Sequence, residues 1–394
     1  MLMARTLIKN AIVISAGSEK ALCGIYINDD GRIADVFRME DFCPSRYSDI
    51  LEEIDASGLV ACPGLIDTHI HGIGGFSTDE ASSDSILGMS KTLSKFGVTA
   101  FIPTLYAGRP EKMEKEIKAV VNAMGKEDGA RILGINLEGP FLSPLKCGAQ
   151  DKDALSLPDV RIFQRLLDAG EGKILAMTVA PELPGIKDVA ELAMKKNVVI
   201  LMGHTNATYE QALQAADMGI CHVTHTFNAM SAFAHKAPGV TGAAMMDERL
   251  FCEIIADGVH VHKDIVKHLI LTKAKDKVVL ITDSLGPTSL GRGNYVANGE
   301  AVVLGEIGAF VDAEDPSKLC GSALTLNRAV ANVRSWGIER PQAVKMATEN
   351  PAKVYGLKEL GSISKGCLAD IALFSENFEP KHVFIGGRHI LGPN

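Results

Sequence analysis

The stretch GLIDTHIHG, residues 64–72, places two histidines two positions apart at the end of an apolar run. Side chains at positions i and i+2 of a β-strand point to the same face, so His69 and His71 would project together. Two imidazoles on one face can hold a metal ion, but a half-exposed strand face can carry the same pattern. The pair alone leaves both interpretations open.

Other titratable side chains stand at the ends of further apolar runs. They are Glu138, His204, His225, His260 and Asp283. In a barrel of parallel strands, the carboxyl ends of the strands form the rim on which active sites are built. Core packing does not account for so many imidazoles and carboxylates at one rim, and we therefore favour a metal site.

Glu138, His204 and His225 offer three nitrogen or oxygen ligands and leave one position open, which is the pattern of a catalytic metal site. A divalent ion held there lowers the pKa of water and polarises a carbonyl. We expect Asp283 to take the proton from the attacking water and to deliver it to a leaving nitrogen. We expect His260 to hydrogen-bond the substrate or the developing oxyanion. These roles predict hydrolysis of an amide or a related bond.

His69 and His71 supply enough extra ligands for a second metal ion. Asp67, two residues before His69, has two interpretations: it orients a ligand imidazole, or it begins the turn into the strand. His222 should face the other side of its strand from the ligands and be structural. His262 should lie in the turn that leads into a helix at 263–274.

Positioning these side chains requires strands that alternate with helices, and the middle of the chain has that alternation. Eight apolar runs are candidate strands: 64–71, 98–105, 131–140, 174–182, 198–205, 221–228, 251–260 and 277–284. Helix-periodic segments such as 111–124, 188–197 and 209–219 lie between them. Eight such units, with no G-x-G-x-x-G after an early strand, predict a TIM-like (β/α)₈ barrel at residues 63–356.

Both ends of the chain consist of short segments with alternating apolar residues. We expect residues 1–62 and 357–394 to form one small β-sandwich domain, in which Asp30 and Gly31 make a hairpin turn. The first 17 residues are apolar, but Arg5 and Lys9 interrupt them and no cleavage site follows. We therefore interpret this segment as a strand and not as a signal peptide.

The composition favours small-molecule partners. The formal charge is −8 and there is no run of Lys and Arg, which argues against a nucleic-acid surface. The sequence contains no apolar stretch of membrane-spanning length, so we expect no membrane contact. The eight cysteines form no C-x-x-C pair, and the reducing cytoplasm is the simplest location.

Seven motifs in the order PGLIDTHIHG, LEGPF, GHTNAT, HTFNAM, DGVH, TDS and GSALTLNRAV carry a resemblance that spans nearly the whole chain. The sequence resembles the N-acetylglucosamine-6-phosphate deacetylase family of the amidohydrolase superfamily. The resemblance implies a metal-dependent hydrolase that converts N-acetylglucosamine 6-phosphate into glucosamine 6-phosphate and acetate, usually as a homodimer. It implies a divalent metal, zinc or iron, with one or two ions per subunit.

By the same resemblance, Glu138, His204 and His225 correspond to metal ligands and Asp283 to the catalytic acid and base. Family members that have both first-strand histidines can hold two ions, and this sequence has both. The residues that match substrate-binding positions are Ala149, Asn228, Ala229, His260 and the backbone of Leu319, Cys320 and Gly321.

Two positions depart from the family pattern. Lys236 stands where the family usually supplies an arginine across the dimer to the sugar phosphate, and a lysine meets a phosphate without the bidentate fork. Gln150 stands in a substrate-binding loop where the family commonly has histidine. An alternative substrate is therefore a related N-acetyl amino sugar, either another epimer or one without the phosphate.

Two further readings compete with the deacetylase. A cyclic amidase usually bridges two ions with a modified lysine at the end of the fourth strand, and the fourth run here ends in TVAPEL without a lysine. A catalytically silent binding protein on the same barrel should have lost a ligand or the acid/base. Glu138, His204, His225 and Asp283 are all present. The missing lysine therefore disfavours the cyclic amidase, and the retained residues disfavour the silent binding protein.

Overall fold

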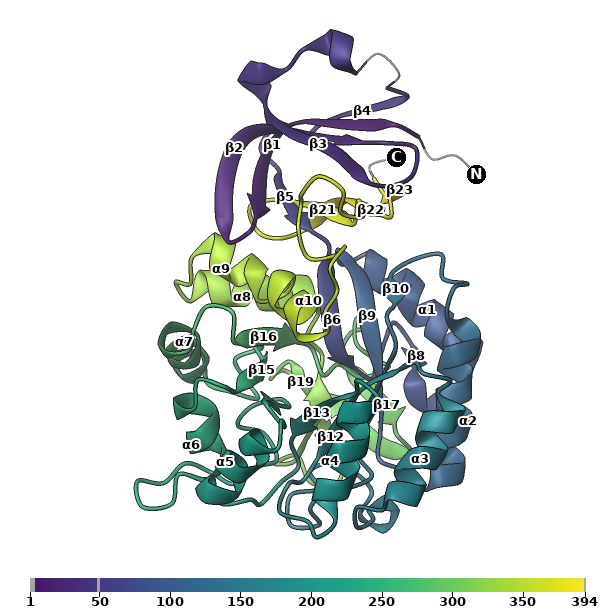
Figure 1. The fold of residues 1–394 in the computed structure, drawn as a ribbon, viewed down its shortest axis with the longest axis vertical. Helices are drawn as coiled ribbons and strands as arrows, with labels where there is room; N and C mark the ends of the chain where they lie inside the picture. The colour runs from purple at the N-terminus through teal and green to yellow at the C-terminus, as the bar shows by residue number, and fades with distance from the viewer. Residues whose placement is uncertain (1–3, 48–49, 393–394) are drawn as a thin grey trace.

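The computed structural model describes residues 4–47 and 50–392, which form two parts stacked along the long axis of the molecule (Figure 1). The larger part is a barrel of parallel strands with helices on its outside. The smaller part is built of strands from both ends of the chain and lies at the top of Figure 1. This arrangement confirms the predicted barrel with a terminal β domain.

The barrel strands run parallel and follow one another around the barrel in chain order. They are β6 (Leu65–Ile70), β9 (Val98–Leu105), β10 (Arg131–Ile132) with β11 (Ile135–Glu138), β12 (Ile174–Val179), β13 (Val199–Met202), β14 (His222–Val223), β15 (Phe251–Ile255) and β16 (Val278–Ile281). All eight expected strands are present. Several end earlier than predicted, and this places His225 and His260 in loops just beyond β14 and β15.

Polar groups at the carboxyl ends of β6 and β16 join the first and last barrel strands. The Thr282 hydroxyl donates to Asp67 Oδ2 at 2.7 Å, and the Asp283 N–H donates to the His69 carbonyl at 2.9 Å. Asp67 is completely buried, and burial raises its pKa to about 7. Asp67 therefore ties the strand of Asp283 to that of His69, which is neither of the roles that the sequence left open for it.

Helices cover the outside of the barrel, and local sequence explains where several of them begin. Pro110 occupies the first turn of α2, where the missing N–H is not needed. At the start of α5, Thr208 and Gln211 form a capping box, each side chain accepting the other's backbone N–H. The helices are α1 (Ser83–Ser94), α2 (Pro110–Ala123), α3 (Val160–Ala169), α4 (Ile186–Lys195), α5 (Tyr209–Asp217), α6 (Gly239–Met246), α7 (Lys263–Thr272), α8 (Leu326–Ser335), α9 (Arg340–Lys345) and α10 (Glu349–Val354).

The terminal β part is one eight-stranded sheet whose halves enclose a shared apolar core. β5 joins the halves, since it pairs with β1 on one side and with β21 on the other. The expected hairpin lies between β2 and β3, and Gly31 takes the left-handed φ of 77° that the turn requires. The strands are β1 (Thr6–Ser15), β2 (Ser18–Ile27), β3 (Ile33–Arg38), β4 (Glu52–Asp55), β5 (Val60–Pro63), β21 (Ile371–Phe374), β22 (Pro380–Ile385) and β23 (Arg388–Leu391). The N-terminal segment is thus a strand from Thr6 on, while its first three residues lie outside the described part.

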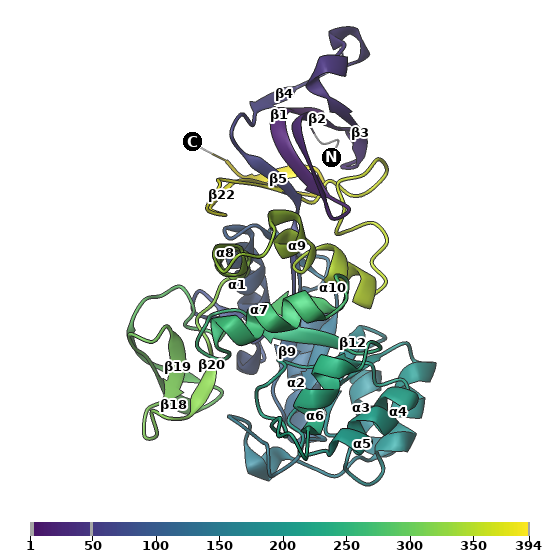
Figure 2. The ribbon, with the colours of Figure 1, turned by 90° about the vertical axis from the view of Figure 1, so that its left-hand side faces the viewer.

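A four-stranded antiparallel sheet follows β16, and the sequence interpretation missed it. Its signal is the pair Asn298 and Gly299, whose φ angles of 49° and 79° make a tight hairpin turn. Its strands are β17 (Gly293–Ala297), β18 (Glu300–Leu304), β19 (Ala309–Asp312) and β20 (Leu319–Ser322). Figure 2 shows β18, β19 and β20 beside the barrel, where β20 carries Leu319, Cys320 and Gly321.

The remaining elements are short. A two-stranded hairpin consists of β7 (Gly72–Ile73) and β8 (Phe76–Ser77), and four single turns of 3₁₀ helix are η1 (Met39–Asp41), η2 (Pro44–Arg46), η3 (Thr78–Glu80) and η4 (Lys152–Ala154). All eight cysteines are free thiols. Within residues 4–47 and 50–392, no helix has both the length and the apolar character needed to cross a bilayer.

Candidate active site

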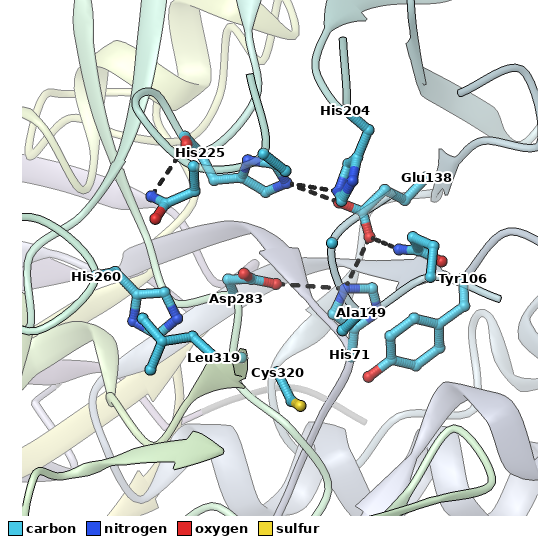
Figure 3. A pocket seen from close by; sticks show the side chains of 15 residues that line it. His71, Tyr106, Glu138, Ala149, His204, His225, His260, Asp283, Leu319 and Cys320 are labelled. Atoms are coloured by element: carbon cyan, nitrogen blue, oxygen red, sulfur yellow. Dashed lines mark hydrogen bonds and ion pairs between the residues drawn. The ribbon is translucent and has the colours of Figure 1, made fainter. Parts of the chain in front are cut away.

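The side chains expected to do chemistry converge at the carboxyl ends of the barrel strands (Figure 3). Glu138 is the last residue of β11, whereas the other ligands and Asp283 lie at or just past their strand ends. His204, His225 and Asp283 have left-handed φ angles of 45°, 29° and 51°. Such angles cost a non-glycine residue about 1–3 kcal/mol and persist where the surroundings enforce them, which is common at functional sites. At these three strand ends the backbone turns sharply, next to the side chains that meet at the centre.

Glu138, His204 and His225 form a first cluster of ligand atoms. Glu138 Oε1 lies 3.0 Å from His204 Nε2 and 2.9 Å from His225 Nε2, and the two nitrogens are 3.0 Å apart. All three residues are buried. The cluster predicted from the sequence is therefore assembled, and its atoms are close enough to share one metal ion.

His69, His71 and Glu138 form a second cluster that shares the same carboxylate. Glu138 Oε2 lies 3.2 Å from His71 Nε2, and Glu138 Oε1 lies 3.5 Å from His69 Nε2. Asp283 Oδ1 faces both imidazoles, at 3.3 Å from His71 and 3.5 Å from His69. The first-strand pair thus points into the site and not to a solvated strand face.

The orientation of two imidazoles fits a metal site. Nδ1 of His71 lies 3.0 Å from the Thr104 carbonyl, and Nδ1 of His204 lies 3.0 Å from the Lys146 carbonyl. A carbonyl only accepts, so each Nδ1 carries a proton and Nε2 is the ring nitrogen that faces the carboxylate of Glu138. A histidine whose Nδ1 is held in this way binds a metal ion through Nε2, so both rings are oriented as ligands. The carboxylate and these ring nitrogens would together hold a divalent ion.

The charges of the site point the same way. Burial alone would lower the pKa of His71, but Asp283 and Glu138 raise it to about 9. Burial would likewise raise the pKa of Glu138, yet the imidazoles of His204 and His69 hold it well below its usual range. The surroundings of Glu138 therefore favour its anionic form and, beside it, a positive charge.

A cavity of about 190 Å³ opens in front of these groups. The residues that the family resemblance assigned to the substrate, apart from Lys236, all line it: Ala149, Gln150, Asn228, Ala229, His260, Leu319, Cys320 and Gly321. Figure 3 shows His260, Leu319 and Cys320 on the side of the cavity across from Glu138. Their contacts with a substrate stay predictions.

His260 is held by a carboxylate that the sequence interpretation did not single out. Its Nδ1 lies 2.6 Å from Asp257 Oδ2, and Asp257 Oδ1 accepts the backbone N–H groups of Val259 and His260 at 2.8 and 2.9 Å. This leaves Nε2 of His260 free to face the cavity. The spacing of Asp and His in DGVH is the signal that could have revealed the pair.

Gln150 contacts a predicted metal ligand as well as the cavity. Its Nε2 donates to Glu138 Oε2 at 2.6 Å, and its Oε1 accepts the Ala107 N–H at 3.0 Å. The expectation from sequence was a contact with the sugar. In the structure this side chain fixes the carboxylate that both ligand clusters share.

Lys236 is the expected site residue that the structure does not bring to the cavity. It is exposed, in a tight turn where Ala234 and Ala237 exchange backbone hydrogen bonds of 3.2 and 3.0 Å. Among the described residues, those that line the cavity include neither lysine nor arginine. Contact between Lys236 and a substrate would therefore need a second copy of the chain, as the family resemblance implied.

The smaller expectations also have outcomes. His222 stacks on Phe251 with ring centroids 4.8 Å apart, consistent with a structural role. His262 is the N-cap of α7, since its Nδ1 accepts the Asp264 N–H at 3.3 Å. Tyr106, which was not predicted, stacks on His71 with centroids 3.8 Å apart and lines the cavity.

The fold and the site together define a class of protein: a (β/α)₈ barrel whose strand ends carry histidine and carboxylate groups that could hold a divalent metal ion. More particularly, the chain belongs to the amidohydrolase family, whose model matches residues 60–390.

Individual relatives match over nearly the full length. The chain is 34% identical to N-acetylglucosamine-6-phosphate deacetylase of Bacillus subtilis, over 96% of this chain and 95% of that one. It is 29% identical to N-acetylgalactosamine-6-phosphate deacetylase of Escherichia coli O157:H7, over 83% and 86% of the two chains. Among solved structures, a mutant N-acetyl-D-glucosamine-6-phosphate deacetylase of Mycobacterium smegmatis in complex with N-acetyl-D-glucosamine-6-phosphate superimposes with a TM-score of 0.90 and 28% identity, covering 98% of this chain and 100% of that one.

Proposed function

We propose that this protein hydrolyses the acetamide of N-acetylglucosamine 6-phosphate, giving glucosamine 6-phosphate and acetate. The observation that carries the proposal is the cluster of Glu138, His204 and His225. Asp283 lies beside it and faces His71, which shares the carboxylate of Glu138. Full-length relatives that carry this name support the proposal. The reaction adds water across the amide C–N bond, so acetate leaves with the water oxygen and the sugar nitrogen gains a proton.

Glu138, His204 and His225 would hold the metal, and His69 and His71 would hold a second ion with the same glutamate. When bound, such an ion polarises a carbonyl and lowers the pKa of water. Asp283 accepts the proton of the attacking water at its carboxylate and delivers it to the amine nitrogen. His260, oriented by Asp257, hydrogen-bonds the substrate from the opposite wall of the cavity.

The identity and number of the ions belong to this proposal. We propose zinc or ferrous iron, with two ions per subunit when both clusters are filled, because imidazole and carboxylate suit these metals. His204→Ala removes a ligand of the first cluster only. This variant should bind less than the wild-type amount of metal by elemental analysis. Wild-type metal content with normal activity would remove His204 from the site.

A related amino sugar is the second candidate substrate. The observation that favours it is the lack of lysine and arginine among the described residues of the cavity wall, since a sugar phosphate carries negative charge. The Escherichia coli relative is named for the galactosamine epimer. The preference for the phosphorylated glucosamine substrate rests on Lys236 reaching the phosphate from a second copy, and we accordingly propose a homodimer.

A cyclic amidase is disfavoured on the same grounds as in the sequence, because β12 (Ile174–Val179) contains no lysine. We propose the cytoplasm as the location, since eight unpaired cysteines suit a reducing compartment.

The experiment that tests the function measures acetate release from four sugars side by side, with protein reloaded with zinc or with ferrous iron. The sugars are N-acetylglucosamine 6-phosphate, its galactosamine epimer and the two unphosphorylated parents. Fastest turnover of the phosphorylated glucosamine sugar is the expected result. Preference for another of the four selects the second candidate, and turnover of none overturns the deacetylase assignment.

A further inference from the structure

Glu253, in β15, is a buried carboxylate beneath the second ligand cluster that neither the sequence interpretation nor the mechanism above uses. Its side chain is only 6% exposed. Glu253 Oε1 accepts the Thr68 hydroxyl at a long 3.4 Å, and Oε2 has no hydrogen-bond partner among the described residues. A carboxylate in the barrel interior is costly unless another group compensates its charge, and the available group is an imidazole.

The neighbour that Glu253 Oε2 faces is Nδ1 of His69, at 3.6 Å. Both ring nitrogens of His69 are buried without a hydrogen bond in the described part of the chain. On the other side of the ring, Nε2 faces Glu138 and Asp283, each at 3.5 Å. The imidazole of His69 therefore lies between the carboxylate of Glu253 behind it and the carboxylates of Glu138 and Asp283 in front of it.

Among the described residues, the three other histidines of the clusters have no carboxylate at Nδ1. Nδ1 of His71 and Nδ1 of His204 face the carbonyls of Thr104 and Lys146, and Nδ1 of His225 has no partner among the described residues. Only at His69, within that part of the chain, does Nδ1 of a ligand histidine face a carboxylate. A carboxylate behind a metal-binding histidine fixes the ring and its tautomer and makes the other nitrogen a better ligand.

We propose that Glu253 is a positioning residue for the second metal site. It holds the proton of His69 on Nδ1, so that the Nε2 lone pair points into the cluster with His71 and Glu138. Glu253 is not among the described residues that line the cavity, and it acts only through His69. This inference rests on the proposed metal-dependent function, and it adds a specific prediction: the two metal sites should respond differently to a change at position 253.

The test measures the affinity of each metal site, with metal content as the readout in place of activity. Metal-free protein is equilibrated with increasing Zn²⁺, and bound zinc is counted by elemental analysis. Co²⁺ titration followed by visible absorption provides a second measure. We expect Glu253→Gln to lower the affinity for one of the two ions by about 10- to 100-fold and to leave the affinity for the other unchanged. His69→Ala should abolish binding of the same ion.

A double variant separates positioning from general structural damage. If Glu253 acts through His69, then Glu253→Gln combined with His69→Ala should bind metal as His69→Ala does alone. The matched control is Asp370→Asn, which changes another buried carboxyl whose Oδ1 accepts the Gly386 N–H at 2.7 Å, away from the ligands. Both metal affinities should be unchanged in this control. If Glu253→Gln does not fold, then Glu253→Asp, which retains the charge at a greater distance, should show a smaller loss at the same ion.

The outcomes distinguish the inference from the proposed function. Unchanged binding of both ions in Glu253→Gln, or equal weakening of both, overturns the positioning role alone. A wild-type protein that binds one ion, with no effect of His69→Ala on it, also overturns the inference and leaves a one-metal deacetylase. A wild-type protein that binds no ion and releases no acetate overturns the proposed function itself.

Discussion

Asp283 Oδ1 lies 3.3 Å from Nε2 of His71, so the expected acid/base faces the second ligand cluster. The two residues follow the last and the first barrel strands, β16 and β6. The side chain of Asp283 is 15% exposed, whereas that of His71 is 2% exposed. Asp283 is therefore the more accessible of the two to a substrate and to water.

Replacing Asp283 with asparagine tests this role. The amide keeps the shape of the side chain but cannot take up a proton, so Asp283→Asn should retain metal and lose about 10²- to 10⁴-fold in kcat. Elemental analysis and the rate of acetate release, measured on the same preparation, check both halves. Loss of metal with proportionate loss of rate would instead make Asp283 a ligand.

Gln150 provides a test of whether that loop serves the metal or the sugar. The side chain donates to Glu138 Oε2 at 2.6 Å, so Gln150→Ala frees the shared carboxylate. We expect metal affinity to fall by about 10-fold or more, as measured by equilibrium dialysis. A raised KM with unchanged metal affinity would show that Gln150 serves the sugar, as the sequence suggested.

The exposed position of Lys236 leads to a prediction on phosphate recognition. If it reaches the substrate from a second copy, Lys236→Ala should raise KM for N-acetylglucosamine 6-phosphate far more than for N-acetylglucosamine. Lys236→Arg, which retains the charge, is the matched control and should preserve the preference. Equal effects of Lys236→Ala on the two sugars would exclude a phosphate contact.

Glu116 in α2 leads to a prediction on the pH dependence of stability. It is 1% exposed, and burial raises its pKa to about 7, against the partial compensation of Lys112 Nζ at 3.6 Å. The folded state therefore retains a proton between about pH 4.5 and pH 7 that the unfolded chain has lost. The protonated Glu116 therefore contributes fully to the free energy of unfolding below pH 4.5, and this contribution is lost as the pH rises to 7. The loss is up to about 3 kcal/mol, at about 1.4 kcal/mol per pKa unit.

Glu116→Gln should remove the loss of unfolding free energy between pH 4.5 and pH 7, because the amide does not titrate. The variant should gain free energy of unfolding relative to the wild type at pH 8 and gain much less at pH 5, as measured by urea denaturation at both values. Lys112→Gln, the matched control, should deepen the loss at pH 8 because it removes the compensating charge. An equal effect of Glu116→Gln at both pH values would contradict a buried, titrating carboxyl.

The sequence determined which residues carry the chemistry. His69 and His71 could be paired because strand side chains alternate with a period of two, and Glu138, His204, His225 and Asp283 could be grouped because parallel strands end at one rim. The eight strands followed from apolar runs, each long enough to stand out locally. Side-chain alternation and apolar runs are properties of short segments, so they can be read from the sequence without knowing the fold.

The tertiary structure decided which groups touch. The link from Asp67 to Thr282 spans 215 positions and that from His69 to Glu253 spans more than 180, so no local pattern could foretell either. Gln150 contacts Glu138 because the loop after β11 folds back over its own strand end, and Lys236 lies in an exposed turn that does not line the cavity. Burial then sets the energetics: Asp67 looks ordinary in the sequence, and its raised pKa depends on the other strands that enclose it. The partner of Glu253 likewise depends on a distant strand.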